Sequence, residues 1–243
     1  MEVTTRMGPA FGVARIVMEP NERVRAEAGA LMATTPTVQV EAKAEGGVMK
    51  SLKRAALGGE SFFLTTYTAP AEGGWIDVAA RLPGDTQVID VVPGQAWFVQ
   101  KGSWLASDID VELDTQWGGF RNMFGSEGAF ILRAEGGGPM VVAAYGGIEA
   151  WDLAPGQTIT LDTGHMVAYQ ESVAMSLRKV TGGLVQTFKS GEGLVFDFTG
   201  PGRVLVQTRN PHEFFSFLSA TLGTGNSGGG STGGLAGGLF GRD

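Results

Sequence analysis

Residues 93–106 read PGQAWFVQKGSWLA, and the same outline occurs twice more in the chain. A proline opens the stretch, a glycine follows nine residues later, and an alanine ends it four residues after the glycine. The other two stretches are PNERVRAEAGALMA at residues 20–33 and PGQTITLDTGHMVA at residues 155–168. Proline presets φ for a tight turn, and the glycine or asparagine after it accepts a positive φ. Each stretch therefore predicts a turn between two strands.

The sequence after each stretch repeats as well. Alternating apolar and polar residues come next, a pattern typical of a strand with one buried face; these segments are 38–42, 111–114 and 173–177. A glycine pair follows, at Gly46-Gly47, Gly118-Gly119 and Gly182-Gly183. A glycine–acid turn then precedes an apolar strand near Phe62, Phe130 and Phe196, and a last strand lies near 76–79, 141–144 and 204–207.

We therefore predict an all-β protein of three tandem repeats, each like a β-sandwich or double-stranded β-helix, arranged around a pseudo-threefold axis. The repeats are expected at about residues 8–82, 83–147 and 148–209, within a single triplicated domain at 1–222. The glycine content supports many tight turns, because 39 of 243 residues are glycine, more than twice the average share of about 7%.

A short helix is predicted at residues 211–222, with Asn210 as its N-cap and Pro211 in its first position. Phe214, Leu218 and Leu222 share one face of this helix, and Gly223 follows its end. Residues 223–243 are rich in glycine and serine, which predicts a flexible tail.

Charge and composition argue against several classes of protein. The net charge is -7, and the only basic cluster is Lys50, Lys53 and Arg54, so we expect no nucleic-acid partner. The chain has no cysteine, no apolar run of eighteen residues and no signal-peptide pattern at its start. We therefore expect a cytoplasmic protein without a transmembrane segment.

The turns at Pro93 and Pro155, the glycine-rich segments at 191–194 and 200–202, and the Gln-Thr-Arg-Asn segment at 207–210 resemble one family. It contains the bacterial and archaeal relatives of the "altered inheritance of mitochondria" biogenesis proteins, and the resemblance covers residues 8–222. It implies a fold like that of the tryptophan RNA-binding attenuation protein, tripled within one chain, and assembly into a homotrimer. Mitochondrial relatives are linked to inner-membrane organisation, which suggests scaffolding, and the resemblance supplies no catalytic residue.

Few residues are suited to chemistry. Two histidines, His165 and His212, lie in unlike contexts, and we interpret both as turn or surface residues. We expect no catalytic residue, no cofactor and no catalytic metal. The glutamates at equivalent places in the three repeats could converge on a cation, but exposed positions in turns between strands are favoured; they are Glu60, Glu127 and Glu192.

Two sets of apolar residues leave alternatives open. The tryptophans could form a base-stacking surface, but core or interface positions are favoured; they are Trp75, Trp97, Trp104, Trp117 and Trp151. Leu235, Leu239 and Phe240 near the C-terminus could dock into a groove, or could be tolerated in a disordered end.

The sequence thus predicts a non-enzymatic oligomeric scaffold or interaction protein that binds itself and a protein partner not identified by its residues. The alternative is a small-ligand or lipid-binding module that uses a cavity among the repeats.

Overall fold

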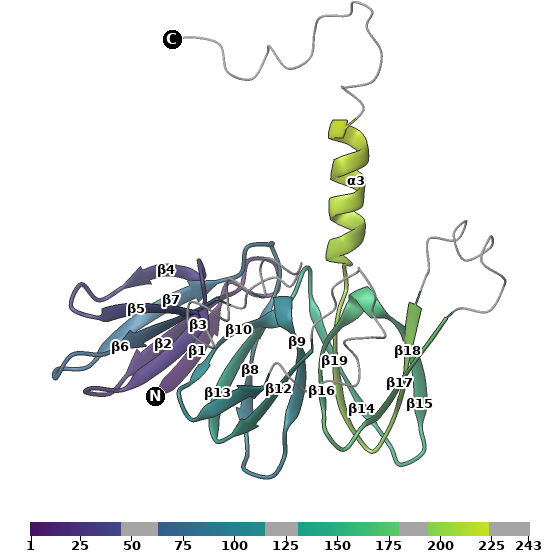
Figure 1. The fold of residues 1–243 in the computed structure, drawn as a ribbon, viewed down its shortest axis with the longest axis horizontal. Helices are drawn as coiled ribbons and strands as arrows, with labels where there is room; N and C mark the ends of the chain where they lie inside the picture. The colour runs from purple at the N-terminus through teal and green to yellow at the C-terminus, as the bar shows by residue number, and fades with distance from the viewer. Residues whose placement is uncertain (45–62, 115–130, 180–193, 224–243) are drawn as a thin grey trace, which may run out of the picture. The chain divides into compact units, whose positions relative to one another are not determined.

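Antiparallel strands make up almost the whole structure, a computed structural model that describes residues 1–44, 63–114, 131–179 and 194–223 (Figure 1). An N-terminal strand, β1 (Glu2–Arg6), precedes three sets of six strands. The first set is β2 (Val13–Met18), β3 (Arg23–Glu27), β4 (Leu31–Thr34), β5 (Gln39–Ala44), β6 (Phe63–Thr68) and β7 (Gly74–Ala79). The second set is β8 (Thr86–Val91), β9 (Trp97–Gln100), β10 (Trp104–Asp108), β11 (Val111–Asp114), β12 (Ile131–Gly136) and β13 (Gly138–Ala143). The third set is β14 (Ile148–Leu153), β15 (Thr158–Asp162), β16 (Met166–Gln170), β17 (Ala174–Lys179), β18 (Leu194–Thr199) and β19 (Gly202–Gln207).

One pairing scheme describes each of these three sets. The first and third strands pair with the sixth, and the second and fourth strands pair with the fifth. A β-bulge interrupts the pairing of the third and sixth strands at one place in each set, just before Ala33, Ala106 and Ala168. The all-β class predicted from the sequence is confirmed, whereas the pseudo-threefold axis stays a prediction.

The proline-led turns have the predicted geometry. The residue after each proline has a positive φ of 61° at Asn21, 80° at Gly94 and 78° at Gly156. In each turn a backbone N–H donates to the carbonyl three residues before it, at 2.9–3.0 Å; the acceptor–donor pairs are Glu19 and Glu22, Val92 and Gln95, and Ala154 and Gln157. Asparagine replaces glycine in the first turn because it tolerates the left-handed region better than other side chains.

Neighbouring sets join through the second strand of one and the third strand of the next. β3 pairs with β10, and β9 pairs with β16. These pairings produce two six-stranded sheets, with strand orders β5-β6-β3-β10-β13-β8 and β11-β12-β9-β16-β19-β14. The other two sheets have the orders β1-β2-β7-β4 and β15-β18-β17. Among the described residues, β4 and β15 are therefore edge strands, as are β1, β5, β8, β11, β14 and β17. Of these, β4 and β15 are the two that are equivalent to strands paired across a junction.

One alternating segment departs from the prediction of a buried face. Val38 is buried, but Val40 on the same side of β5 is 53% exposed. β5 is the outermost strand of its sheet, but so is the equivalent strand β11, so the edge position alone does not explain this exposure. The matching residues of the second set, Val111 and Leu113, are buried as predicted.

The predicted C-terminal helix is confirmed as α3 (Pro211–Gly223). Contacts divide the chain into two compact units, Met1–Asn210 and Pro211–Asp243. Within α3, Phe214 and Leu218 are half-buried, as expected for a shared face. Leu222, predicted on the same face, is instead 77% exposed because it lies in the last turn of the helix.

Candidate functional site: the open edges of β4 and β15

The two internal junctions between sets have one register. Each contains three residue pairs, and an alanine of the third strand lies at the first of them. The pairs are Ala26–Ala106, Arg25–Ser107 and Val24–Asp108 in the first junction, and Val99–Ala168, Phe98–Tyr169 and Trp97–Gln170 in the second. Counted from the proline and glycine of each repeated stretch, the two junctions use the same positions.

Side chains of each third strand enter the apolar cluster of the set before it. Leu105 and Ala106 of β10 belong to the cluster built on Ile16 and Ile76 of the first set. In the same way, Val167 and Ala168 of β16 belong to the cluster of the second set. In the repeated stretch, Val167 is equivalent to Leu105, and Ala168 is equivalent to Ala106. A junction therefore combines backbone pairing with completion of the preceding core.

The strand β4 also has apolar residues at these positions, but they are exposed to solvent. Leu31 is 37% exposed and Met32 is 57% exposed. The residues at the same positions of the other third strands are at most 1% exposed; they are Trp104 and Leu105 in β10 and Met166 and Val167 in β16. Within the described ranges, no strand pairs with the outer edge of β4. The exposure of Met32 follows from that open edge, because its counterparts Leu105 and Val167 are covered by the preceding set.

Among the described strands, β15 also has an unpaired outer edge, on the side where the equivalent second strands pair with a third strand. Its outer edge carries no paired strand in the part of the chain that the structure describes, although the equivalent strands β3 and β9 each pair on both sides. Leu161 is buried, Ile159 is half-buried and Thr160 is exposed. The hydroxyl of Thr160 donates to Asp197 at 2.6 Å. Hydrogen bonds from Arg178 and then from Thr160 lower the pKa of the Asp197 carboxyl.

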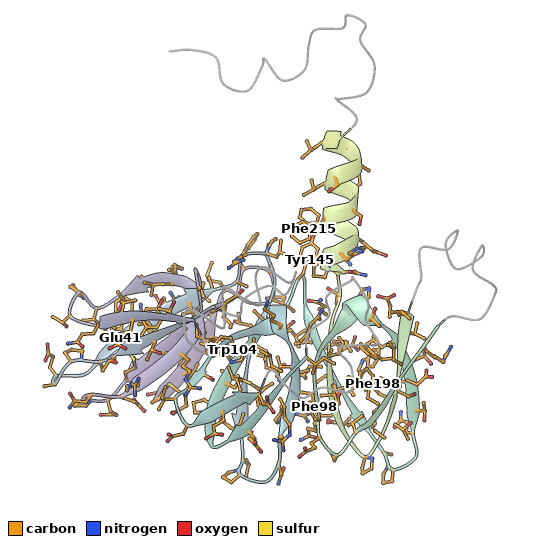
Figure 2. All side chains as sticks on the ribbon, viewed as in Figure 1. Glu41, Phe98, Trp104, Tyr145, Phe198 and Phe215 are labelled. Atoms are coloured by element: carbon orange, nitrogen blue, oxygen red, sulfur yellow. The ribbon has the colours of Figure 1, made fainter. Side chains whose placement is uncertain are left out.

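The apolar cluster of the third set ends at this edge. It is built on Leu161, Phe196 and Phe198, and it receives Phe98 and Ile131 from the second set. Phe98 and Phe198 can be located in Figure 2. Among the described residues, no later third strand contributes side chains to this cluster as β10 and β16 do to the other two.

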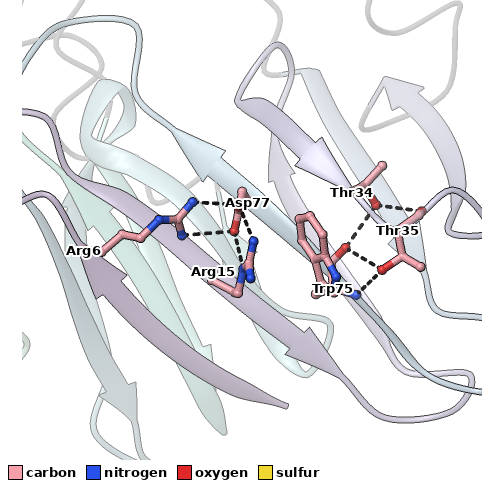
Figure 3. A network of polar contacts seen from close by, with 6 residues as sticks. All are labelled: Arg6, Arg15, Thr34, Thr35, Trp75 and Asp77. Atoms are coloured by element: carbon pink, nitrogen blue, oxygen red, sulfur yellow. Dashed lines mark hydrogen bonds and ion pairs between the residues drawn. The ribbon is translucent and has the colours of Figure 1, made fainter.

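A charged network lies beside β4 (Figure 3). Asp77 on β7 is 2% exposed and accepts two hydrogen bonds from Arg15 at 2.8 and 2.9 Å and two from Arg6 at 2.7 and 3.2 Å. The Arg15 guanidinium also lies 4.0 Å from the centre of the Trp75 ring. Hydrogen bonds from Arg15 and then Arg6 lower the pKa of Asp77 to about 2, although burial opposes the shift. Because Arg6 lies on β1 and Asp77 on β7, these hydrogen bonds link β1 to the first set.

Asp77 occupies a position that is apolar in the other sets. Its cross-strand partner is Arg15, whereas the same place in the second set pairs Val88 with Val141. In the sequence Asp77 interrupts a strand that otherwise reads as apolar, and this interruption is the signal that could have indicated a buried ion pair.

The segment at 207–210 binds backbone groups of two loops. The buried Gln207 amide donates to the Gly164 carbonyl at 2.8 Å and accepts from the Tyr145 N–H at 2.9 Å. The Thr208 hydroxyl accepts a hydrogen bond from the Gly147 N–H at 2.9 Å. The Asn210 side-chain amide donates to the Asp162 carboxylate at 3.3 Å. Gln207 and Thr208, two of the residues that carried the family resemblance, thus bind loop backbone, and Asn210 binds a side chain.

Only some of the residues considered for chemistry lie within the described ranges. His165 lies in a 3-10 turn, with its Nδ1 2.7 Å from the Gln207 carbonyl, and His212 is exposed on α3. Trp97 and Trp104 are core residues, and Trp75 and Trp151 are half-buried. The remaining predicted residues lie outside the described ranges; they are Lys50, Lys53, Arg54, Glu60, Trp117, Glu127, Glu192, Leu235, Leu239 and Phe240.

Two further features are absent from the described residues. No group of three or more His, Cys, Asp or Glu side chains in those residues could hold a metal ion, and the absence of a catalytic metal stays a prediction. No helix in the described ranges is long and apolar enough to cross a membrane.

Comparison with known proteins places the chain in a family. The model of the family described as "Mitochondrial biogenesis AIM24" matches residues 4–209. The chain belongs to the AIM24 family. An uncharacterised protein of Streptococcus pyogenes serotype M6 is 26% identical over an alignment of 236 positions, which covers 93% of each chain.

One crystal structure has a fold similar to that of this chain. It is the structure of a Streptococcus pyogenes protein that is 24% identical, with a TM-score of 0.74. The similarity covers 90% of this chain and 99% of that one. At this level of identity the likeness concerns the fold alone. The names of these two proteins state no activity, so the function of the chain has to be argued from its own surface.

Proposed function

We propose that the chain is a non-enzymatic scaffold that assembles from several copies of itself, with a homotrimer as the expected form. The observation that carries this proposal is the exposure of Leu31 and Met32 on β4, an edge strand. An edge strand presents unpaired N–H and C=O groups, so it is a template for pairing with another chain. Proteins that avoid such pairing place charges or proline on the edge, and β4 reads LMAT.

Membership of the AIM24 family supports a structural role, and the homotrimer rests on the family resemblance together with the two open edges. The pseudo-threefold repeat, the attenuation-protein fold and a cytoplasmic location belong to the same proposal. A further protein partner is part of it as well, because a scaffold acts by holding other molecules. The net charge of -7 leads us to expect no RNA in that role, and gel retention at physiological salt tests this.

Light scattering on the purified protein at micromolar concentration tests the proposal. We expect about three times the chain mass of 25.4 kDa. A monomer at that concentration would overturn the proposal. Native mass spectrometry of the same sample distinguishes the alternative, because a stoichiometric small molecule that co-purifies would favour a ligand-binding module.

A further inference from the structure

We propose that β15 of one copy pairs with β4 of a second copy, in the register of the two internal junctions, and that Met32 of the second copy enters the apolar cluster of the first copy's third set. This inference rests on the proposed self-assembly and names the surface that performs it. Both strands end their sheets within the described residues, and each is equivalent to a strand that is paired in an internal junction.

The register follows from the two internal junctions. In each of those junctions, the residue six positions after the proline of one repeated stretch pairs with the residue four positions after the glycine of the next stretch. The same rule pairs Leu161 with Ala33 and Thr160 with Thr34. Ala33 is equivalent to Ala106 and Ala168, the small residues at the matching place of both internal junctions.

The side chain of Met32 also matches those that cross the internal junctions. In the internal junctions, the residue three positions after the glycine enters the cluster of the preceding set, as Leu105 and Val167 do. The equivalent residue of β4 is Met32, which is 57% exposed in the single chain. The third-set cluster receives no such residue from the described part of its own chain. An unbranched methionine suits this place because it adapts to irregular apolar surfaces.

The two edges lie at opposite ends of the β unit Met1–Asn210 (Figure 1). One chain therefore offers both halves of the junction to two different neighbours, which is a head-to-tail interface. Such an interface forms a ring if its rotation closes, and a filament if it does not. A second copy is a better occupant than an unrelated strand because the chain already contains this pairing twice.

The junction between chains contains more polar groups than the internal junctions. Asp77 pairs with Ala33, at the place where Val141 and Leu205 pair with Ala106 and Ala168. Its charge is neutralised by the two arginines Arg6 and Arg15. This composition is typical of an interface between chains that each fold alone, which is more polar than a domain core.

Cysteine cross-linking tests the register, and the chain suits it because it has no native cysteine. One sample carries Thr34→Cys and another carries Thr160→Cys, and the two are mixed and oxidised. We expect disulfide-linked dimers from the mixture and none from either variant alone, since paired residues of adjacent strands lie within disulfide reach. Thr34→Cys mixed with Thr158→Cys is the register control, and should cross-link far less because diagonal positions are too distant.

A double variant shows whether the junction joins two chains. Arg25→Cys with Ser107→Cys occupies the same positions of the first internal junction and should close within one chain without raising its mass. Thr34→Cys with Thr160→Cys in one chain should instead yield covalent multimers. If the second variant closes within a monomer, the second copy is excluded. If light scattering shows an oligomer but the mixed variants do not cross-link, the scaffold proposal stands and this junction is wrong.

Met32→Lys tests the apolar contact. We expect at least a ten-fold weaker association, because a charged group cannot fill the apolar place without losing the favourable burial of the methionine. Val40→Lys, at a site of similar exposure on β5, is the matched control and should assemble like the parent. Circular dichroism verifies folding of both. Equal assembly of Met32→Lys and the parent would overturn the inference.

Discussion

The rings of Phe98 and Tyr169 face each other across the junction of β9 and β16, with their centroids 5.0 Å apart. Tyr169 also lies 5.0 Å from Phe198. All three rings are at most 3% exposed, and burial raises the pKa of the Tyr169 hydroxyl. The junction between the second and third sets is therefore stabilised by packed aromatic rings in addition to backbone hydrogen bonds.

Phe98→Ala should destabilise the protein by about 3–5 kcal/mol, because it leaves a cavity among side chains that cannot fully collapse. Thr160→Ala is the matched control, since Thr160 holds the equivalent position on the open edge of β15. It is exposed, so its truncation should change the free energy of unfolding by less than about 0.5 kcal/mol. Urea denaturation measures both. Equal losses would contradict the stabilisation of the β9–β16 junction by packed aromatic rings.

The repeated turns and strands could be predicted because their causes are local. A proline followed by glycine or asparagine sets a turn wherever it occurs, and Asn21, Gly94 and Gly156 all have the expected positive φ. The pairing of β3 with β10 could not be predicted in the same way. It joins Arg25 to Ser107, residues 82 positions apart, and no local pattern encodes which strand becomes the neighbour of another.

Asp77 gives a pH-dependent contribution to stability. Its pKa of about 2 in the folded protein lies below the ordinary aspartate value of 3.8, so the charged form favours folding. The contribution of about 2 kcal/mol is complete above about pH 5 and is lost as the pH falls from about 4 to about 2. Urea denaturation of the parent and of Asp77→Asn between pH 7 and pH 2 should show this part of the pH dependence in the parent alone.

An exposed ion pair supplies the control for that experiment. Asp152 on β14 accepts hydrogen bonds from Arg203 at 2.7 and 2.9 Å, but its side chain is 68% exposed. Water and salt screen such a pair, so Asp152→Asn should leave the pH profile unchanged. If both variants change the profile equally, burial of Asp77 is not the source of its effect.

Gly84 tests a close approach of two backbone segments. It forms a bridge with Gly146, and a Cβ at Gly84 would lie 1.9 Å from the Ala144 carbonyl oxygen. Gly84→Ala should therefore cost about 3 kcal/mol, the upper part of the range for overpacking. Gly102→Ala is the control, because no heavy atom lies within 4 Å of a Cβ there. Thermal denaturation should place the Gly102 variant at or slightly above the parent.

The candidate site was only partly accessible from sequence. The repeated positions show that Met32 is equivalent to Leu105 and Val167, yet exposure depends on which strands find a neighbour. Likewise, Arg6 and Asp77 are 71 residues apart, and only the folded sheet brings them together. Polar residues that bind backbone, such as Gln207, look like surface residues in a sequence because their partners belong to loops elsewhere.

Gln207 provides the last prediction, since its amide serves as both donor and acceptor at a site that is 3% exposed. Gln207→Leu would leave the Tyr145 N–H and the Gly164 carbonyl without this partner, and each buried unsatisfied group costs about 1–3 kcal/mol. Gln207→Glu keeps the acceptor, but its carboxylate cannot donate to the Gly164 carbonyl. Protonation restores a donor, so the loss in Gln207→Glu, relative to the parent at the same pH, should be large at pH 7 and smaller at pH 4. The loss in Gln207→Leu should not change between these pH values. Urea denaturation at both pH values measures this difference, and parallel behaviour of the two variants would show that the amide acts by its volume alone.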